Sequence, residues 1–286
     1  MVMEANAEHF AIHRPVSFEL PRSYVSDIPE GPTDMAGVSI VIPAYNEEAR
    51  LPQTLEKYLS VLEQEPRPYE VIVVVDGVKD RTAEVARQFA HRGVRVLEFP
   101  QRLGKGGAIK VGVYGARYEY VGYVDADGPV LGSDLVQMVH TLPTCDAVIA
   151  SRWVRGSNIV VQQPVSRVVM GRIWNALTRS LLLLPVKDTQ CGAKFFRRSV
   201  LRSSLQSVLI TNWAFDAGLL FHLRKKGYHL REVPVTWNHV ENSRLNPGTE
   251  VPKMFLSVLA VRVMSFRFAH LIPKPLVLKF QRMVNE

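Results

Sequence analysis

Short apolar runs alternate with segments of helical spacing between residues 38 and 125. The run 38–42 is closed by Pro43, and the apolar residues that follow at Leu51, Leu55 and Leu59 predict a helix. Gly93 ends a second helical segment. This alternation predicts an α/β fold, a mostly parallel sheet with helices on both faces. The predicted strands are 38–42, 70–75, 94–99 and 120–124, and the predicted helices are 47–63, 81–91 and 104–118.

The alternation loosens after residue 145. We expect further strands at 146–151, 192–196 and 228–235, with helices at 164–184, 213–226 and 250–270. In a parallel sheet, ligands bind beyond the carboxyl ends of the strands. The segments that follow the first four strands are polar or glycine-rich, as a binding face requires, and comprise residues 43–47, 76–80, 100–107 and 125–128.

The composition is that of a globular protein. The chain has 286 residues, of which 47% are apolar and 22% charged, which excludes disorder, collagen and coiled coil for the whole chain. At roughly 100–200 residues per domain, it forms one large or two small domains. Cys145 and Cys191 form neither a disulfide framework nor a zinc motif, which fits a reducing compartment.

Charge divides the chain into two unlike halves. Residues 1–150 hold 14 Lys and Arg against 21 Asp and Glu, a balance of −7, whereas residues 151–286 hold 21 against 6, a balance of +15. A basic half attracts nucleic acid, an anionic membrane or phosphorylated ligands. We expect no nucleic acid partner, because interleaved basic and aromatic motifs are absent from the sequence.

Two apolar segments are interrupted only by basic residues. They comprise residues 164–186, with Arg167, Arg172 and Arg179, and residues 254–272, with Arg262, Arg267 and His270. Neither is an uncharged stretch of about 20 residues, so we expect no membrane-spanning helix. Each is either an amphipathic helix in a membrane interface or a buried helix whose arginines extend to solvent. Residues 1–36 lack a signal-peptide pattern and are predicted to be an N-terminal extension.

The pair Asp125 and Asp127 directly follows a predicted strand. Two carboxylates at i and i+2 on a turn can reach one hard divalent cation, which would neutralise a diphosphate. The alternative is a turn in which both aspartates bond their own backbone. Their position beside three other polar strand ends favours the metal site.

Other candidate ligands follow the first three strands. Tyr45 could stack on a base, and Glu47 or Asp76 could accept from a ribose or base, although Glu47 also suits the first turn of a helix. Asp80 has a competing interpretation as the N-cap of the next helix. The Gly104-Lys105-Gly106 start of a helix favours an anion. Neither a P-loop nor a GxGxxG motif is present, which argues against an ATPase or NAD enzyme.

Together these motifs resemble family 2 glycosyltransferases of the GT-A (Rossmann-like) fold. The later motifs look like the polyprenyl-phosphate branch of that family, closest to the dolichyl-phosphate β-glucosyltransferases. The resemblance covers about residues 38–250. It is carried by SIVIPAYNEE at 39–48, EVIVVVD at 70–76, GKG at 104–106, DADG at 125–128, DTQCGAKFF at 188–196, WAFD at 213–216 and EVPVTW at 232–237.

The resemblance implies an inverting transfer of a hexose, expected to be glucose from UDP-glucose, to a polyprenyl phosphate with Mg²⁺ or Mn²⁺. Its domain would span residues 37–250, with 251–286 as a C-terminal amphipathic segment. The nucleotide-sugar residues would be Pro43, Ala44, Tyr45, Glu47, Asp76, Lys105, Asp125 and Ala126, and the metal ligands Asp125 and Asp127. The acceptor phosphate would meet Arg152, Gln190 and Arg244, and the catalytic group would be Asp216, Arg152 and Arg244.

Three positions depart from the family pattern. Val75 replaces the first of two aspartates after the second strand, and Gly218 stands where the family often has a glutamate. The late Gly-Ser-Lys of the family becomes Asn242-Ser243-Arg244, which keeps the positive charge. The relatives' N-terminal membrane anchor has no counterpart in residues 1–36.

The charge of the second half bears on the acceptor independently of the resemblance. A phosphate monoester, with a second pKa near about 6, is already mostly a dianion at neutral pH and needs cations rather than a base. A hydroxyl acceptor needs a carboxylate base, and Asp188 and Asp216 are the only aspartates after residue 150. We therefore expect a peripheral protein on the cytoplasmic face of a membrane. The alternatives are a transferase acting on a sugar hydroxyl, with Asp216 as base, and a non-catalytic nucleotide-sugar-binding protein.

Overall fold

The computed structural model describes residues 36–77, 79–161, 165–208, 214–238 and 247–264. Arg244, Arg267, His270 and nearly all of the predicted N-terminal extension lie outside the described residues. Within the described part of the chain, no helix combines the length and apolar character needed to cross a membrane.

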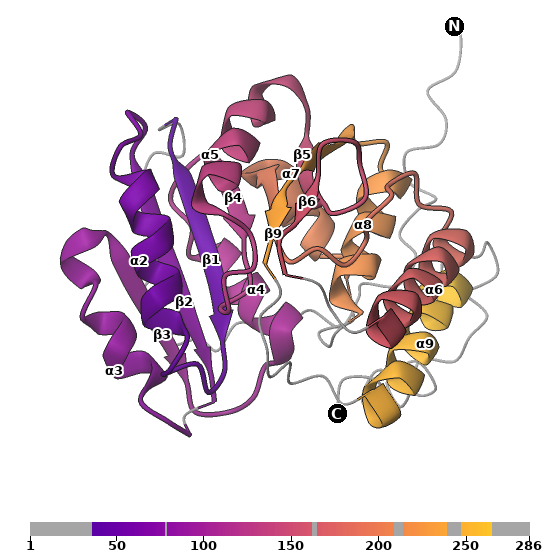
Figure 1. Ribbon diagram of the computed structural model, residues 1–286, viewed down its shortest axis with the longest axis horizontal. Helices are drawn as coiled ribbons and strands as arrows, with labels where there is room; N and C mark the ends of the chain where they lie inside the picture. The colour runs from indigo at the N-terminus through magenta and orange to yellow at the C-terminus, as the bar shows by residue number, and fades with distance from the viewer. Residues whose placement is uncertain (1–35, 78, 162–164, 209–213, 239–246, 265–286) are drawn as a thin grey trace, which may run out of the picture.

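A seven-stranded sheet forms the centre of the molecule (Figure 1). One strand, β7, runs antiparallel to both of its neighbours, and the other pairings are parallel, which confirms the predicted mostly parallel sheet. The order across the sheet is β3 (Val94–Phe99), β2 (Tyr69–Asp76), β1 (Val38–Ala44), β4 (Tyr120–Tyr123), β7 (Lys194–Arg197), β5 (Ala147–Ser151) and β8 (Leu230–Pro234).

Strand β1 shows why the sheet is covered on both faces. Ile40 and Ile42 point into one apolar core, whereas Val41 between them points into the other, because side chains alternate along a strand. Both faces of such a strand are apolar, which is the pattern of a parallel sheet between helices. One core is closed by α2 (Leu51–Leu62), α3 (Thr82–Arg87) and α5 (Gly132–Thr141), and the other by α4 (Gly104–Tyr114), α7 (Arg198–Leu205) and α8 (Phe215–Lys225).

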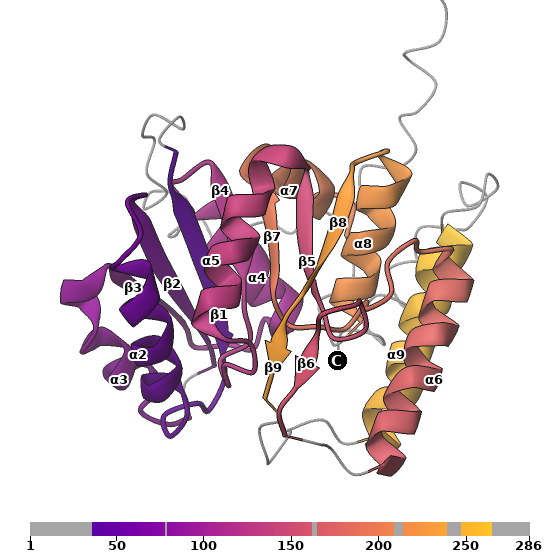
Figure 2. The same ribbon diagram turned by 45° about the horizontal axis from the view of Figure 1, so that its top comes forward.

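Two long helices, α6 (Val165–Leu182) and α9 (Pro247–Met264), lie side by side at the edge of the molecule remote from β3 (Figure 2). Both correspond to predicted helices. A second sheet of two short strands, β6 (Asn158–Ile159) and β9 (Thr236–Trp237), lies between them and the main sheet.

Several element boundaries differ from the expected ones. The first helix begins at Leu51 rather than at residue 47, because the chain turns at Asn46, which has a left-handed φ of 54°. The helix expected at 104–118 ends at Tyr114. Helices α5 and α7 were not predicted, since they are short and contain many polar residues, and tertiary packing rather than periodicity stabilises them.

Candidate active site

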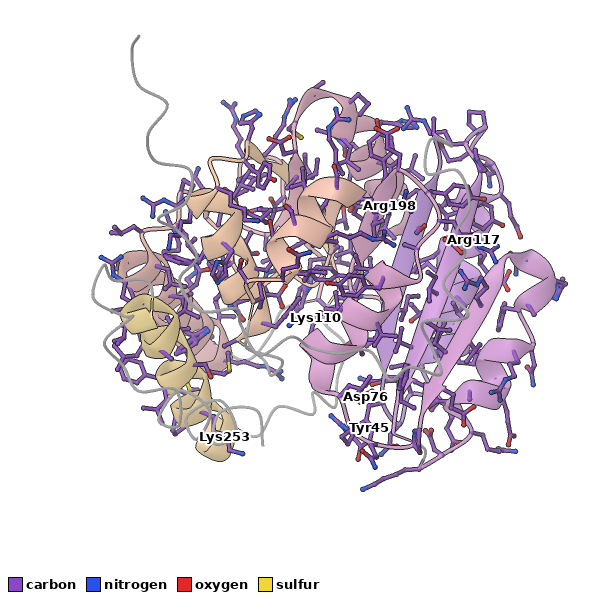
Figure 3. All side chains as sticks on the ribbon, turned by 180° about the vertical axis from the view of Figure 1, so that it is seen from behind. Tyr45, Asp76, Lys110, Arg117, Arg198 and Lys253 are labelled. Atoms are coloured by element: carbon purple, nitrogen blue, oxygen red, sulfur yellow. The ribbon has the colours of Figure 1, made fainter. Side chains whose placement is uncertain are left out.

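The carboxyl ends of the parallel strands meet at one edge of the sheet. The register pairs Ala44 of β1 with Val75 of β2, so Tyr45 and Asp76 follow at the same level. Figure 3 shows Tyr45 and Asp76 close together below the strands. Asp125 follows β4, which pairs with the other side of β1. The edge therefore brings the predicted binding segments together.

Lys105 connects two of the predicted site residues. Its Nζ lies 2.8 Å from Asp125 Oδ1 and 3.2 Å from Asp216 Oδ2. The other oxygen of Asp216 accepts from Lys194 Nζ at 2.5 Å and from the Tyr123 hydroxyl at 2.6 Å. Asp216 and Lys194 are buried. Lys105 thus pairs with both carboxylates and Lys194 with Asp216, in a network that spans α4, β4, β7 and α8.

The charges of this network fix the protonation of Asp216. Burial alone would raise the pKa of Asp216, but the ammonium groups of Lys105 and Lys194 outweigh it and lower that pKa to about 2. The pKa of Lys105 is raised because Asp125 and Asp216 outweigh the opposite effect of burial. Both residues are therefore ionised throughout the physiological range.

The side chain of Asp127, two residues after Asp125, is 30% exposed. Burial and the neighbouring Asp125 raise its pKa to about 6, against the opposing effect of Arg50. Arg50 Nη1 is 3.8 Å from Asp127 Oδ2 and is buried without a hydrogen-bond partner, while its other nitrogens bond Glu47 at 2.7 and 2.8 Å. A neighbouring carboxylate that raises the pKa of Asp127 in this way marks a concentration of negative charge that a cation would relieve.

The donor set fits a hard divalent cation in part. Carboxylate oxygens of Asp125 and Asp127 are the ligands that Mg²⁺ and Mn²⁺ prefer. No cluster of three or more Asp, Glu, His or Cys side chains suited to a metal occurs in the part of the chain that the structure describes. A cation held here would therefore take its remaining ligands from water and from a bound diphosphate.

The predicted nucleoside residues are arranged around Arg102. Its guanidinium stacks 3.5 Å above the Tyr45 ring, and its Nε lies 3.2 Å from Asp76 Oδ2. Asp76 also accepts from the backbone N–H groups of Leu103 and Gly104, the latter at 3.1 Å. The Asp76 carboxylate thus holds the loop that leads into α4.

Three other predicted nucleotide residues contribute little side chain to the surface. Ala44 and Ala126 are buried in an apolar core, and Pro43 is half-buried in β1. A ligand at these positions would meet backbone. The alternative interpretation of Asp80 as a helix N-cap is wrong by one residue, because the N-cap of α3 is Arg81; Asp80 precedes it and accepts from the Thr82 N–H at 3.0 Å.

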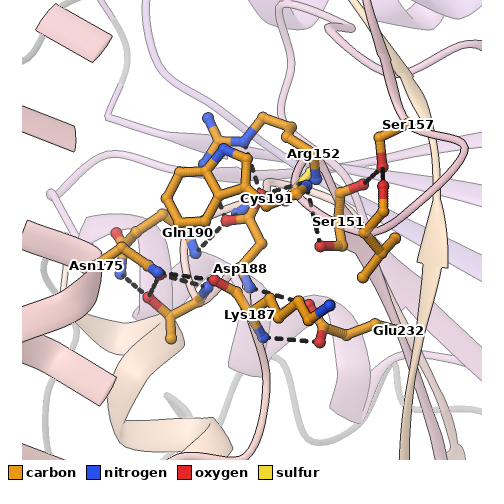
Figure 4. Close-up of polar contacts among 12 residues, drawn as sticks. Ser151, Arg152, Ser157, Asn175, Lys187, Asp188, Gln190, Cys191 and Glu232 are labelled. Atoms are coloured by element: carbon orange, nitrogen blue, oxygen red, sulfur yellow. Dashed lines mark hydrogen bonds and ion pairs between the residues drawn. The ribbon is translucent and has the colours of Figure 1, made fainter. Parts of the chain in front are cut away.

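Arg152 belongs to a separate polar cluster after β5 (Figure 4). Its Nε and Nη2 donate to Asp188 at 2.7 and 2.9 Å, and its backbone N–H donates to the same carboxylate at 3.0 Å. Asp188 also accepts from the backbone N–H of Gln190 at 3.1 Å. Arg152 and Gln190, both predicted to meet the acceptor phosphate, are therefore held by the same carboxylate. Two of the guanidinium nitrogens of Arg152 are already hydrogen-bonded to Asp188.

Several residues of the site were not predicted from the sequence. Lys194 was quoted only as part of a motif, and Tyr123 only as part of a strand. The sequence positions of Arg50 and Arg102 could have indicated a role in the site, since Arg50 lies close to the predicted ligand segment 43–47 and Arg102 lies within the segment 100–107.

Comparison with known proteins identifies the family of the chain. The family model described as Glycosyl transferase family 2 matches residues 39–205. A Dictyostelium discoideum protein named dolichyl-phosphate beta-glucosyltransferase is 30% identical over 82% of this chain and 76% of its own. A human protein of the same name is 32% identical over 79% of this chain and 75% of its own.

Solved structures share the fold. Glucosyl-3-phosphoglycerate synthase from Mycobacterium tuberculosis, in complex with Mg²⁺ and uridine diphosphate, aligns with a TM-score of 0.60 at 20% identity over 81% of both chains. The same protein with Mn²⁺, UDP-glucose and phosphoglyceric acid gives a TM-score of 0.59 at 20% identity, again over 81% of both chains. With a GT-A fold and a family match over more than half of its length, the chain belongs to glycosyl transferase family 2.

Proposed function

We propose that this enzyme transfers glucose from UDP-glucose, with inversion, to a dolichyl-type polyprenyl phosphate. The names of the relatives support both the sugar and the acceptor. One observation in the chain itself carries the proposal: Asp216, the best candidate for a general base, is held between two lysines.

A hydroxyl acceptor would need a carboxylate able to take its proton. Among the side chains of the basic half that the structure describes, the carboxylates are those of Asp188, Asp216 and Glu232, and all three are engaged. Asp188 pairs with Arg152, and Glu232 accepts from two backbone N–H groups at 2.7 and 2.9 Å. The pKa of Asp216 near 2 makes it a weak base. A phosphate dianion needs no proton removed, which favours the phosphate acceptor.

The roles of the site residues follow from this reaction. Asp125 and Asp127 would hold Mg²⁺ or Mn²⁺, which when bound offsets the charge of the leaving diphosphate. Lys105 would add a cation beside the same diphosphate, and Asp216 would orient Lys105. Around the nucleoside we assign Pro43, Ala44, Tyr45, Glu47, Asp76 and Ala126.

The acceptor phosphate requires cations on the opposite side of the reacting carbon. We assign this role to Arg152, with Gln190 from the same cluster and Arg244, which lies outside the described residues. Asp188 would then orient Arg152 through its two hydrogen bonds to the guanidinium. A lipid acceptor requires the enzyme to work at a membrane surface, and we propose a peripheral location on the cytoplasmic face, where anionic lipids attract the basic half.

A transfer assay tests the proposal. The purified chain is given radiolabelled UDP-glucose, Mn²⁺ and a short-chain polyprenyl phosphate in detergent, and the lipid fraction is extracted. We expect label in lipid with the phosphate acceptor and none with the matched polyprenol, which presents a hydroxyl. NMR of the product should give the β anomer. Equal transfer to the polyprenol, or label only in a soluble glucoside, would favour the hydroxyl-acceptor alternative.

A further inference from the structure

The large apolar side chains that are exposed gather on one part of the molecule. In the described ranges they all lie in residues 159–183 or 255–263, and Ile173, for example, is 63% exposed. An apolar patch of this kind marks an interaction surface rather than a chance distribution. The residues concerned are Ile159, Val160, Val161, Val165, Val168, Val169, Met170, Ile173, Leu177, Leu183, Phe255, Leu256, Leu259 and Val263.

Helices α6 and α9 supply most of this surface. Residues 167–173 of α6 are all exposed, and its buried residues, Asn175, Thr178 and Leu182, lie in its later turns. On α6, Val165, Val169, Ile173 and Leu177 follow at intervals of four residues, which places them on one face. On α9, Phe255, Leu259 and Val263 repeat the same interval. The two helices pack side by side (Figure 2). We therefore treat their exposed apolar residues as parts of one surface.

The charges among the apolar residues of α6 are of one sign. The sequence from Arg152 to Lys187 contains no Asp or Glu, and α6 carries Arg167, Arg172 and Arg179. Arg167 and Arg172 are exposed. A second copy of the same surface would bring like charges together, which opposes self-association. Apolar side chains with arginines between them instead match an anionic lipid surface.

The opposite side of α6 is tied to the acceptor cluster. Asn175 is buried and donates from Nδ2 to the Lys187 carbonyl at 2.7 Å. Its Oδ1 accepts from the Thr189 N–H and hydroxyl at 2.9 and 2.8 Å. These bonds fix residues 187–189, and Asp188 among them holds Arg152 (Figure 4).

We propose that the exposed faces of α6 and α9, with residues 159–161, form a docking face for an anionic bilayer, and that Asn175 joins this face to the Arg152 cluster. The proposal rests on the proposed function in that the acceptor is a lipid, and it adds the surface that meets the lipid. Docking would then set the position of Arg152 relative to the phosphate headgroups.

Vesicle flotation tests the docking face. Wild-type protein should bind phosphatidylcholine vesicles that contain phosphatidylserine more than pure phosphatidylcholine vesicles, and less as salt is raised. Ile173→Glu should reduce the bound fraction about tenfold, since it replaces an inserted apolar group with a like-charged one. Gln53→Glu, at an exposed position of α2, adds the same charge elsewhere and should bind as wild type does. Arg172→Gln should lower only the phosphatidylserine-dependent part.

The outcomes separate this proposal from the proposed function. Equal binding by the Ile173→Glu and Gln53→Glu variants would overturn the docking face, and so would a wild-type dimer in light scattering that Ile173→Glu dissociates. Transfer to short-chain polyprenyl phosphate in detergent needs no docking. Transfer in detergent without vesicle binding would support the proposed function and contradict the docking face. Vesicle binding without transfer would support the docking face and contradict the proposed function.

A kinetic measurement tests the link through Asn175. Asn175→Ala should leave vesicle binding unchanged and raise the KM for polyprenyl phosphate about tenfold, since it removes hydrogen bonds that hold the 187–189 segment. The KM for UDP-glucose should not change, because the hydrogen bonds of Asn175 go to Lys187 and Thr189, neither of which is assigned to the donor site. Thr178→Ala, one helical turn further along α6, is the control for the loss of a buried polar side chain. Equal changes in both KM values, or the same effect from Thr178→Ala, would mean that Asn175 serves only the fold.

Discussion

Gly192 lies so close to Asp125 that a Cβ atom on residue 192 would be 1.8 Å from Asp125 Oδ2. No heavy atom fits at that distance, so only glycine allows the loop after Asp188 to pass beside this carboxylate. The segment that carries Gln190 and the carboxylate that would bind the metal are therefore in direct contact. The proposed donor and acceptor sides of the site therefore meet at this point.

Gly192→Ala should impair the donor site more than the fold. The new methyl group forces either Asp125 or the loop to move, and overpacking of this kind costs about 1–3 kcal/mol. We expect Mn²⁺-dependent binding of UDP-glucose to weaken at least about tenfold, measured by calorimetry. Gly171→Ala is the matched control, because a Cβ at residue 171 of α6 meets nothing within 4 Å. Undiminished donor binding by the Gly192→Ala variant would contradict the contact.

Asp127→Asn should abolish transfer while the metal-free protein stays folded. The substitution removes half of the carboxylate charge offered to the cation. Because burial and Asp125 raise the pKa of Asp127 to about 6, its charge at pH 7 opposes folding of the metal-free chain. Thermal unfolding without metal should therefore occur at the same or a higher temperature in this variant.

The control for Asp127→Asn is Glu84→Gln, which removes one charge from the exposed surface of α3. It should leave transfer and metal-dependent donor binding as they are. Full wild-type turnover in excess chelator, or an active Asp127→Asn variant, would contradict the assignment of a metal to Asp125 and Asp127.

The parts of the site that follow local patterns were predictable. Asp76 is the last residue of the apolar strand β2, Asp125 follows the end of β4 by two residues, and parallel strands bring their carboxyl ends together. The turn after β4 shows a limit of such patterns, because the side chain of Ala126, next to Asp125, is buried in the core rather than on the binding face.

The remaining contacts depend on pairings between distant segments. Lys194 lies opposite Tyr123 because β7 runs antiparallel beside β4, and both side chains bond Asp216 of α8, an arrangement that no local pattern indicates. Arg152 was expected to face a phosphate, and its partner Asp188 lies 36 residues away. Neither pairing has a sequence spacing that would identify it, since each depends on how the second half of the chain returns to the sheet.

Lys194→Met should destabilise the fold strongly. Lys194 is buried and neutralises buried Asp216, and removing one partner of such a pair costs about 3–5 kcal/mol. We expect a fall of that size in the free energy of unfolding, measured in urea at pH 7. Lys187→Met removes an exposed lysine and is the control. The double variant Lys194→Met, Asp216→Asn should recover part of the loss. Equal losses in the Lys194→Met and Lys187→Met variants would contradict the pairing.

His222 should make the fold less stable in mild acid. Burial, then Lys225, Lys226 and Lys110, lower its pKa to about 4, whereas an unfolded histidine has a pKa of about 6.5. Between these values the unfolded chain binds a proton that the folded chain does not. The contribution of neutral His222 to stability is therefore complete above about pH 6.5, decreases as the pH falls, and is lost at about pH 4.

Replacing His222 with glutamine should remove this dependence. We expect the free energy of unfolding of the wild type to fall by up to about 3 kcal/mol more than that of the His222→Gln variant between pH 7 and pH 4. Urea titrations at several pH values measure the difference, and the groups common to both proteins cancel in it. His91→Gln replaces an exposed histidine and should keep the wild-type slope. Parallel curves for the wild type and the His222→Gln variant would show that His222 titrates normally in the folded protein.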